Sequence, residues 1–213
     1  MIFSSDKVIE IFPGRTAYDV FYIFYLWGRI PNSGEPKVKR PTWDEYFMML
    51  AKLAASRSTC ISRPTGSVIV KDRQILATGY NGALPGQGHC VDDGECFRRS
   101  VEWPEATKYD MCRSAHAEAN AIALGAKKGV SLEGATIYCT LEPCITCAKL
   151  IVMSGISRVV YEYAYESPIP ERDKYWKDVL ATSHTTVERL MLSPEKIGYA
   201  ADFLNPDTSR RRV

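Results

Sequence analysis

The sequence predicts an α/β sandwich in which helices pack on a central sheet. From Thr42 onward, short runs rich in β-branched and aromatic residues alternate with segments of helical pattern, as in proteins whose strands are joined by helices. The chain has 213 residues, of which 46% are hydrophobic and 24% charged, as in ordinary globular proteins. We therefore expect one α/β domain with extensions.

The first expected elements precede a long loop. Thr42-Trp-Asp-Glu45 fits a capping box that opens a helix reaching about Ser56. Val68–Thr78 is expected to form a hairpin, because two β-rich runs flank a polar turn. Residues 84–112 have the composition of a loop and carry three of the cysteines.

Helices and strands alternate in the second half. One helix is expected over Ala117–Lys128, ended by Gly129, and another between Pro143 and Gly155. The other expected elements are strands at Ala135–Thr140, Arg158–Tyr163 and Thr186–Leu190, and a helix near Asp173–Ala181.

The two ends of the chain differ from this regular pattern. We expect an N-terminal extension of unknown role over residues 1–40, the main domain over 41–195 and a C-terminal tail over 196–213. The last residues, Ser209–Val213, are expected to form a solvated end.

Composition excludes several classes of function. The net charge of +2 is too balanced to indicate a nucleic-acid partner. The most apolar run, Val20–Trp27, is far shorter than the roughly 20 residues of a membrane span and lacks the flanks of a signal peptide. We expect a cytoplasmic protein without a membrane partner, whose seven cysteines are free thiols or metal ligands.

Two motifs carry the residues of a metal site. They are His116-Ala-Glu118 and Pro143-Cys144-Ile-Thr-Cys147, each placed where a helix is expected to begin. Two thiolates and one imidazole supply the three protein ligands of a hydrolytic zinc site, which leaves a fourth position for water. Cys144 and Cys147 share one helical face, and a helix N-terminus favours their thiolate forms. These three side chains are the expected ligands of a catalytic zinc ion.

Glu118 is expected to transfer protons rather than to bind the metal. It would take a proton from water and pass it to the ring nitrogen of a substrate and then to the leaving amine. Alone, the Cys-x-x-Cys pair could be a redox motif, His116 a buried histidine and Glu118 a solvated helix residue. Together they match H-x-E followed by P-C-x-x-C, the signature of zinc-dependent deaminases.

From about Arg40 to Tyr165 the chain resembles the deoxycytidylate (dCMP) deaminase family, especially its bacterial and phage members. The matching segments are Arg57–Cys60, Gly66–Asp72, Ile75–Gly82, Cys112–Ile122 and Leu141–Lys149. The resemblance implies a three-layer α/β/α sandwich of the cytidine deaminase-like type with a mixed sheet. It also implies zinc-dependent hydrolysis of dCMP to dUMP and ammonia, which supplies dUMP for thymidylate synthesis. One segment departs from the family, because Thr65-Gly66-Ser67 stands where Val-Gly-Ala is usual.

The resemblance also implies substrate contacts and partners. Asn81 is expected to contact the sugar or the base, and Tyr165 to pack against the base. Arg63 is a candidate phosphate contact, since guanidinium groups suit phosphate. As alternatives, Asn81 would only shape its turn and Arg63 would be a solvated loop cation. Family members often form hexamers that dCTP activates and dTTP inhibits with Mg²⁺, so a homo-oligomer with allosteric nucleotides is implied here.

A second, structural zinc ion is a further implication of the resemblance. Its ligands would be four cysteines in regions where bacterial and phage members often hold zinc: Cys60, Cys90, Cys96 and Cys112. Four thiolates close a tetrahedral shell, and His89 could replace a neighbouring ligand. Such a site would order the long loop, whereas the alternative is scattered free thiols. Cys139, in an expected buried strand, is interpreted as a packing residue.

Three other functions stay open. A tRNA adenosine deaminase would also carry the Leu-Glu-Pro-Cys segment, although Asn120, the Tyr-Asn-Gly turn and the extra cysteines argue against it. Thr65 and Ser67 leave room for a 5-substituted dCMP or another cytosine nucleotide as substrate. A zinc-stabilised binding module without catalysis would have no use for Glu118.

Overall fold

The computed structural model describes residues 40–102, 104, 111–165 and 170–204. The expected N-terminal extension, apart from Arg40, and the basic end Ser209–Val213 therefore lie outside the described residues. No helix in this described part is long and apolar enough to cross a membrane.

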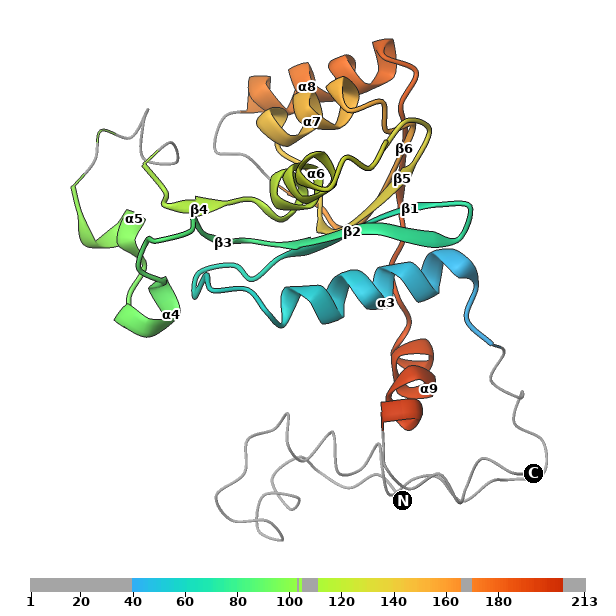
Figure 1. Ribbon diagram of the computed structural model, residues 1–213, viewed down its shortest axis with the longest axis horizontal. Helices are drawn as coiled ribbons and strands as arrows, with labels where there is room; N and C mark the ends of the chain where they lie inside the picture. The colour runs from blue at the N-terminus through green and yellow to red at the C-terminus, as the bar shows by residue number, and fades with distance from the viewer. Residues whose placement is uncertain (1–39, 103, 105–110, 166–169, 205–213) are drawn as a thin grey trace, which may run out of the picture. The chain divides into compact units, whose positions relative to one another are not determined.

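A five-stranded mixed sheet forms the centre of the domain (Figure 1). In spatial order the strands are β2 (Gln74–Tyr80), β1 (Gly66–Lys71), β5 (Thr136–Leu141), β6 (Arg158–Tyr163) and β7 (Thr186–Arg189). β1 pairs antiparallel with both β2 and β5, whereas β5, β6 and β7 run parallel to one another. Parallel neighbours need helical crossovers, which explains the alternation of strands and helices in the second half of the sequence.

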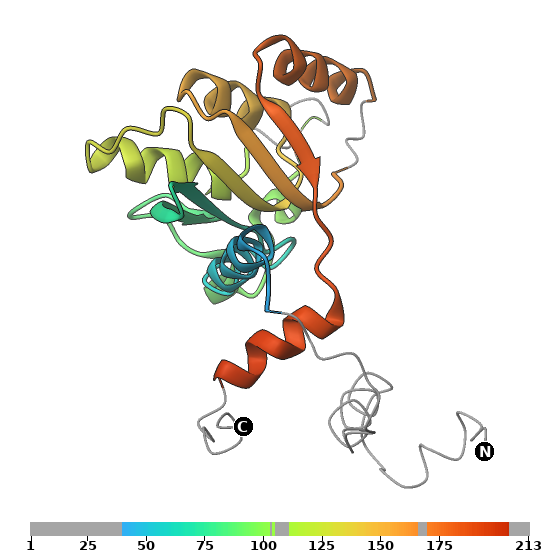
Figure 2. The same cartoon turned by 90° about the vertical axis from the view of Figure 1, so that its right-hand side faces the viewer.

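Helices cover both faces of this sheet, as the two perpendicular views show (Figures 1 and 2). One face carries α6 (Ala117–Lys127), α7 (Ile145–Met153) and α8 (Pro170–Thr182), and the other carries α3 (Trp43–Ala55). The last helix, α9 (Pro194–Leu204), lies on the side of α3, where Lys196 Nζ is 3.7 Å from Glu45 Oε2. The expected three-layer α/β/α sandwich is confirmed.

The helix ends follow the local signals of the sequence. The Thr42 hydroxyl accepts the Glu45 backbone N–H at 3.2 Å, and the Thr42 N–H donates to the Glu45 carboxylate at 2.7 Å. This pair is the expected capping box of α3. At α7, Cys144 is the N-cap and Gly155 follows the helix with a φ of 76°, as the bracketing Pro and Gly predicted.

The expectation of a loop over residues 84–112 was wrong in part. Within residues 84–112, expected as loop, lie two single-turn helices, α4 (Cys90–Asp93) and α5 (Phe97–Ser100). Beside them β3 (Gly82–Ala83) pairs antiparallel with β4 (Ser114–Ala115). The tail expected from residue 196 begins within α9. Helices of one turn are too short to produce a recognisable 3.6-residue period, which is why the sequence did not indicate them.

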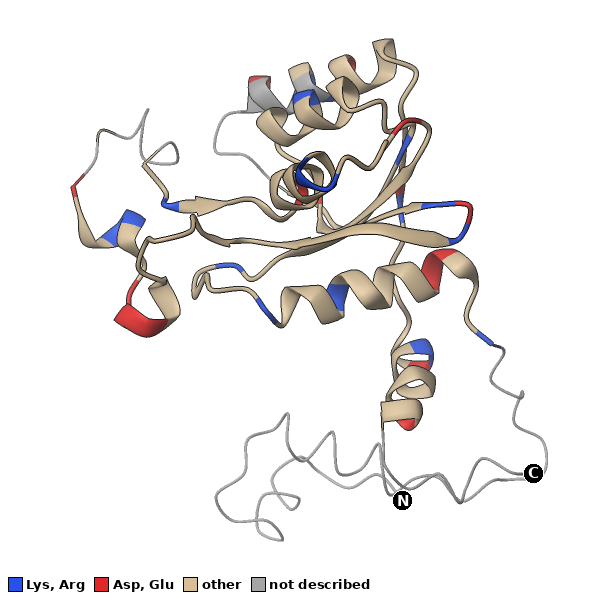
Figure 3. Ribbon diagram, in the orientation of Figure 1, with Lys and Arg blue, Asp and Glu red and all other residues tan. Residues whose placement is uncertain are grey.

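The core lies on both faces of the sheet, because side chains alternate along a strand. Facing α6 and α7 are Ile69, Ile137 and Val159, and facing α3 are Val68, Tyr138 and Val160, all buried. Both α3 and α9 carry acidic as well as basic residues; on α3 the acidic ones lie in the first turn and Lys52 in the last (Figure 3). This mixture agrees with the small net charge.

β2 approaches α6 more closely than a side chain would allow. A Cβ atom at Gly79 would lie 2.1 Å from the carbonyl oxygen of Ala117 and 2.6 Å from the backbone nitrogen of Ala121. The contact fixes the first turn of α6 against the sheet, and that turn carries Glu118.

Candidate metal centre and nucleotide pocket

Three expected metal ligands converge where α6 and α7 begin. His116 is the N-cap residue of α6 and Cys144 that of α7, while Cys147 lies in the first turn of α7. The Nδ1 atom of His116 is 3.4 Å from each of the two Sγ atoms. All three donor atoms lie within 4.8 Å of one another, and the described residues contain no other group of three or more such donors.

The chemistry of these donors fits zinc. Two soft thiolates and one imidazole form a common zinc ligand set, and three protein ligands leave a fourth coordination position for a reacting molecule. Cys144 and Cys147 stand at the N-terminus of α7, and a helix N-terminus favours thiolate over thiol. In the absence of an ion the pKa of Cys144 is lowered to about 3. The hydrogen bond from Cys147 has the larger effect and the hydrogen bond from His116 the smaller one.

The same contacts change the proton affinity of His116 and Cys147. The hydrogen bond to Cys144 raises the pKa of His116 to about 9, and a hydrogen bond to Cys144 with burial raises the pKa of Cys147. In the metal-free protein a Cys144 thiolate is therefore held by two proton donors. A divalent cation would take the place of those two protons.

Glu118 lies beside the three donors as a buried carboxyl group. It is the second residue of α6 and only 7% exposed. Burial raises its pKa to about 7. A carboxyl group that titrates near neutral pH can both accept and return a proton, which is the property needed for proton transfer.

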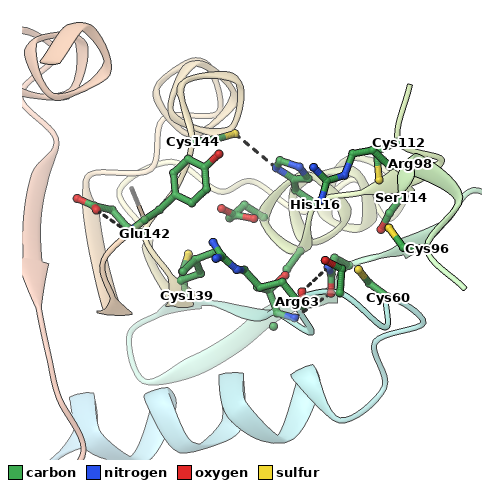
Figure 4. A pocket seen from close by; sticks show the side chains of 18 of the residues that line it. Cys60, Arg63, Cys96, Arg98, Cys112, Ser114, His116, Cys139, Glu142 and Cys144 are labelled. Carbon is green, nitrogen blue, oxygen red and sulfur yellow. Dashed lines mark hydrogen bonds between the residues drawn. The ribbon is translucent and has the colours of Figure 1, made fainter. Parts of the chain in front are cut away.

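A cavity of about 280 Å³ opens beside these residues (Figure 4). His116, Glu118 and Cys144 line it, and so do the three expected substrate contacts, Arg63, Asn81 and Tyr165. The structure thus brings the expected ligands, the expected proton-transfer residue and the expected substrate contacts to one site.

The side chain of Asn81 is committed to contacts within the protein. Its carbonyl oxygen accepts the Ser58 hydroxyl at 2.6 Å and the Thr65 N–H at 2.8 Å. Its amide donates to the Arg63 carbonyl at 2.9 Å. Asn81 therefore fixes the loop before β1, and its contact with a substrate stays a prediction.

Arg63 and Tyr165 face each other at the cavity. The Arg63 guanidinium lies over the Tyr165 ring, 5.9 Å from its centroid. Arg63 is exposed, so its cation is available at the wall of the cavity. This arrangement is compatible with both expected roles, phosphate contact and base contact.

The structure gathers three of the four cysteines proposed for a second metal ion. Cys60, Cys96 and Cys112 line the same cavity on the side away from Glu142 (Figure 4), whereas Cys90 is buried outside the lining. Their donor atoms do not form a group within 4.8 Å among the described residues. The Nδ1 atom of His89 is buried without a hydrogen-bond partner.

Several lining residues were not predicted. Arg98 and Arg99 of α5 and Glu142, just after β5, also line the cavity, although no role was expected for them. The two arginines belong to a single-turn helix that the sequence did not indicate. Glu142 stands next to Pro143 and Cys144, which was the available signal. Cys139, expected to pack in a buried strand, is buried and also lines the cavity floor.

The three-layer sandwich and the imidazole–dithiol centre define the class of zinc-dependent deaminases of nucleobases and nucleotides. A family described as the cytidine and deoxycytidylate deaminase zinc-binding region matches residues 41–163, which is more than half of the chain. The chain belongs to this family.

Individual relatives agree with this assignment. The chain is 46% identical over 129 residues to a deoxycytidylate deaminase of Mycobacterium phage D29, covering 58% of this chain and 97% of that protein. It is 38% identical over 143 residues to a deoxycytidylate deaminase of Schizosaccharomyces pombe, covering 66% of this chain but only 44% of that protein. A dCMP deaminase from cyanophage S-TIM5, solved in complex with dCMP and dUMP, has a TM-score of 0.57 and 29% identity and covers 71% of this chain and 99% of that one.

Proposed function

We propose that this protein is a zinc-dependent hydrolase that converts dCMP to dUMP and ammonia. The observation that carries the proposal is the convergence of His116, Cys144 and Cys147 beside the buried carboxyl group of Glu118. The names of the phage and yeast relatives support dCMP as the substrate.

In this proposal the three donors hold zinc and Glu118 moves protons. A bound zinc ion supplies a Lewis acid that activates water at neutral pH. Glu118 accepts a proton from the attacking water and delivers it to N3 of the cytosine ring. It then accepts the proton of the new C4 hydroxyl group and passes it to the leaving amine. Burial raises the pKa of this carboxyl group to about 7 in the metal-free protein, which favours a group that can both accept and return a proton.

The phosphate of the substrate would meet a cationic wall. Arg63 comes from the loop before β1, and Arg98 and Arg99 come from α5, so guanidinium groups from two segments line one cavity. Guanidinium groups bind phosphate through paired hydrogen bonds. Tyr165 would pack against the base, and Asn81 would contact the sugar or base through its remaining amide hydrogen.

The substrate is tested by ultraviolet absorbance with dCMP, CMP, dCTP, deoxycytidine and 5-methyl-dCMP. We expect dCMP to have the highest kcat/KM and deoxycytidine to lose at least about tenfold, the value of one charge-assisted hydrogen bond. Equal turnover of deoxycytidine and dCMP would contradict the role of the arginines. Better turnover of 5-methyl-dCMP would shift the proposal to a 5-substituted substrate.

The role of Glu118 is tested with Glu118→Gln, which keeps the size of the side chain and removes the titrating group. We expect bound zinc and folding to stay near the native level and turnover to fall at least about 100-fold. Lys127→Ala is a suitable control, because Lys127 lies at the other end of α6, about 14 Å along the helix axis. Near-normal activity of Glu118→Gln would exclude the proposed mechanism.

The remaining parts of the proposal concern additional ligands and assembly. A second zinc ion would use Cys60, Cys96 and Cys112, with Cys90 or the unpartnered His89 completing the shell. One zinc ion per fully loaded chain in metal analysis would exclude it. The protein would form a homo-oligomer, a hexamer in the family pattern, which analytical ultracentrifugation tests. Its effectors would be dCTP and, with Mg²⁺, dTTP, which initial rates measured with each nucleotide test.

A further inference from the structure

Glu142 presents a buried carboxylate at the point where β5 turns into α7. It is 4% exposed and immediately precedes Pro143 and the expected zinc ligand Cys144. A buried carboxylate is costly unless hydrogen-bond donors surround it. The partners of Glu142 should therefore reveal what it holds in place.

Its neighbours come from β6, from the residues just after β6 and from α8. Glu142 Oε2 accepts the backbone N–H of Tyr165 at 3.0 Å, and burial together with the nearby Glu142 carboxylate raises the pKa of Tyr161 on β6. Lys177 of α8 places its Nζ 3.9 Å from Oε1, although this lysine is largely exposed. The exposed lysine contributes little, so the Tyr165 contact dominates.

The contact with Tyr165 continues the β5–β6 pairing past its normal end. The backbone N–H of Glu142 donates to the Tyr163 carbonyl at 2.8 Å, which is the last backbone bond between the two segments before the chain enters α7. Two residues further on, the Glu142 side chain accepts the N–H of Tyr165 in place of a strand neighbour. Glu142 thus links the segment after β6, which carries Tyr165, to the start of α7, which carries Cys144.

This tie determines where the wall of the cavity lies. Tyr165 lines the cavity and faces the Arg63 guanidinium, and Glu142 lines the same cavity from below the metal ligand Cys144 (Figure 4). We propose that Glu142 is a positioning residue, which sets the distance between the metal centre and the Tyr165–Arg63 wall through its hydrogen bond to the Tyr165 amide. The proposal rests on the proposed function only for its kinetic consequence.

Glu142→Leu tests this role, because it keeps the approximate volume and removes both acceptors. We expect KM for dCMP to rise about tenfold, the value of one lost hydrogen bond, while kcat changes less than about threefold and bound zinc is unchanged. Glu142→Gln should restore a KM near the native value, because its carbonyl still accepts the Tyr165 N–H. Tyr161→Phe is the matched control, since it removes the neighbouring phenol hydroxyl and leaves the Tyr165 contact in place.

Hydrogen–deuterium exchange of the Tyr165 amide provides a measurement that needs no substrate. We expect fast exchange in Glu142→Leu and native protection in Glu142→Gln and Tyr161→Phe. Should the leucine variant fail to fold, Glu142→Asp replaces it, because its shorter side chain cannot reach the Tyr165 N–H. The proposal would be overturned if the Tyr165 amide exchanged as slowly in Glu142→Leu and Glu142→Asp as in the native protein. An unchanged KM in these variants would overturn it as well.

These measurements separate the two proposals. If the native protein does not deaminate dCMP, the proposed function fails while the exchange experiment still decides whether Glu142 holds Tyr165. If dCMP is deaminated and the exchange of Tyr165 does not depend on Glu142, the positioning role alone is wrong.

Discussion

The hydroxyl of Ser67 donates a 2.8 Å hydrogen bond to the carbonyl of Ala117, which ties β1 to the first residue of α6. Ser67 is fully buried and does not line the cavity, whereas Thr65, two residues earlier, does. The serine that departs from the usual family pattern therefore supports the helix that carries Glu118. Of the two departures, Thr65 alone is placed to influence the choice of substrate.

Ser67→Ala should lower stability without changing substrate preference. Removal of one buried hydrogen bond costs about 1 kcal/mol, and a smaller side chain at this position leaves the cavity lining intact. Urea unfolding measures the first effect, and the ratio of kcat/KM for dCMP and 5-methyl-dCMP measures the second. A changed ratio would mean that Ser67 affects the substrate through α6.

Gly79→Ala should disturb the site from the neighbouring strand, because Gly79 on β2 is paired with Ser67 on β1. The added Cβ would lie 2.1 Å from the Ala117 carbonyl, so the helix would have to move away from β2. Overpacking of this kind costs about 1–3 kcal/mol. Because Glu118 moves with the first turn, we expect kcat to fall more than KM changes. A Gly79→Ala variant with native kcat and stability would show that β2, rather than α6, moves to make room for the added Cβ.

Glu118 should give the metal-free protein a dependence of stability on pH. Its folded pKa of about 7 is raised above the ordinary value of 4.5, so its contribution is complete below pH 4.5 and is lost as the pH rises through 7. At pH 8 the loss is on the order of 3 kcal/mol. Glu118→Gln should therefore gain stability relative to the native protein between pH 5 and pH 8 in denaturant unfolding with chelator present. If the free energy of unfolding varied with pH in the same way in Glu118→Gln and in the native protein, the raised pKa of Glu118 would be contradicted.

The ion pair between Asp44 and Arg158 should have the opposite pH dependence. Asp44 Oδ1 and Oδ2 lie 2.8 and 2.9 Å from the two terminal nitrogens of Arg158, which joins α3 to β6. The hydrogen bond to Arg158 lowers the pKa of Asp44, so its contribution is present above 3.8 and lost as the pH falls below that value. Asp44 is more than a third exposed, so solvent screening reduces the effect to less than about 1 kcal/mol. Asp44→Asn should lower the thermal midpoint slightly at pH 7, and the difference from the native protein should shrink as the pH falls below 3.8.

The sequence predicted those elements whose signals are local. The capping box at Thr42 and the Pro143 and Gly155 boundaries specify helix ends through neighbouring residues. The three candidate metal ligands, which the structure brings together, could be picked out because their residue types and spacing are typical of zinc chemistry.

The features that the sequence missed depend on contacts between distant segments. The α5 arginines reach the cavity only because β3 and β4 pair and direct the loop there. Likewise, the Asn81 amide contacts residues 16 to 23 positions away, and Glu142 meets a donor 23 positions away. No local pattern specifies such partners, so they become visible only once the sheet is formed.

The two halves of the site belong to different kinds of structure. The candidate metal ligands stand at the starts of α6 and α7, which are packed on the sheet, whereas Arg63 and Tyr165 stand on connecting segments and Arg98 on the single-turn helix α5. If these three residues bind the nucleotide as proposed, evolution can exchange the segments that recognise it while the reaction centre stays unaltered. The same separation makes these connections the place to redesign specificity without rebuilding the enzyme.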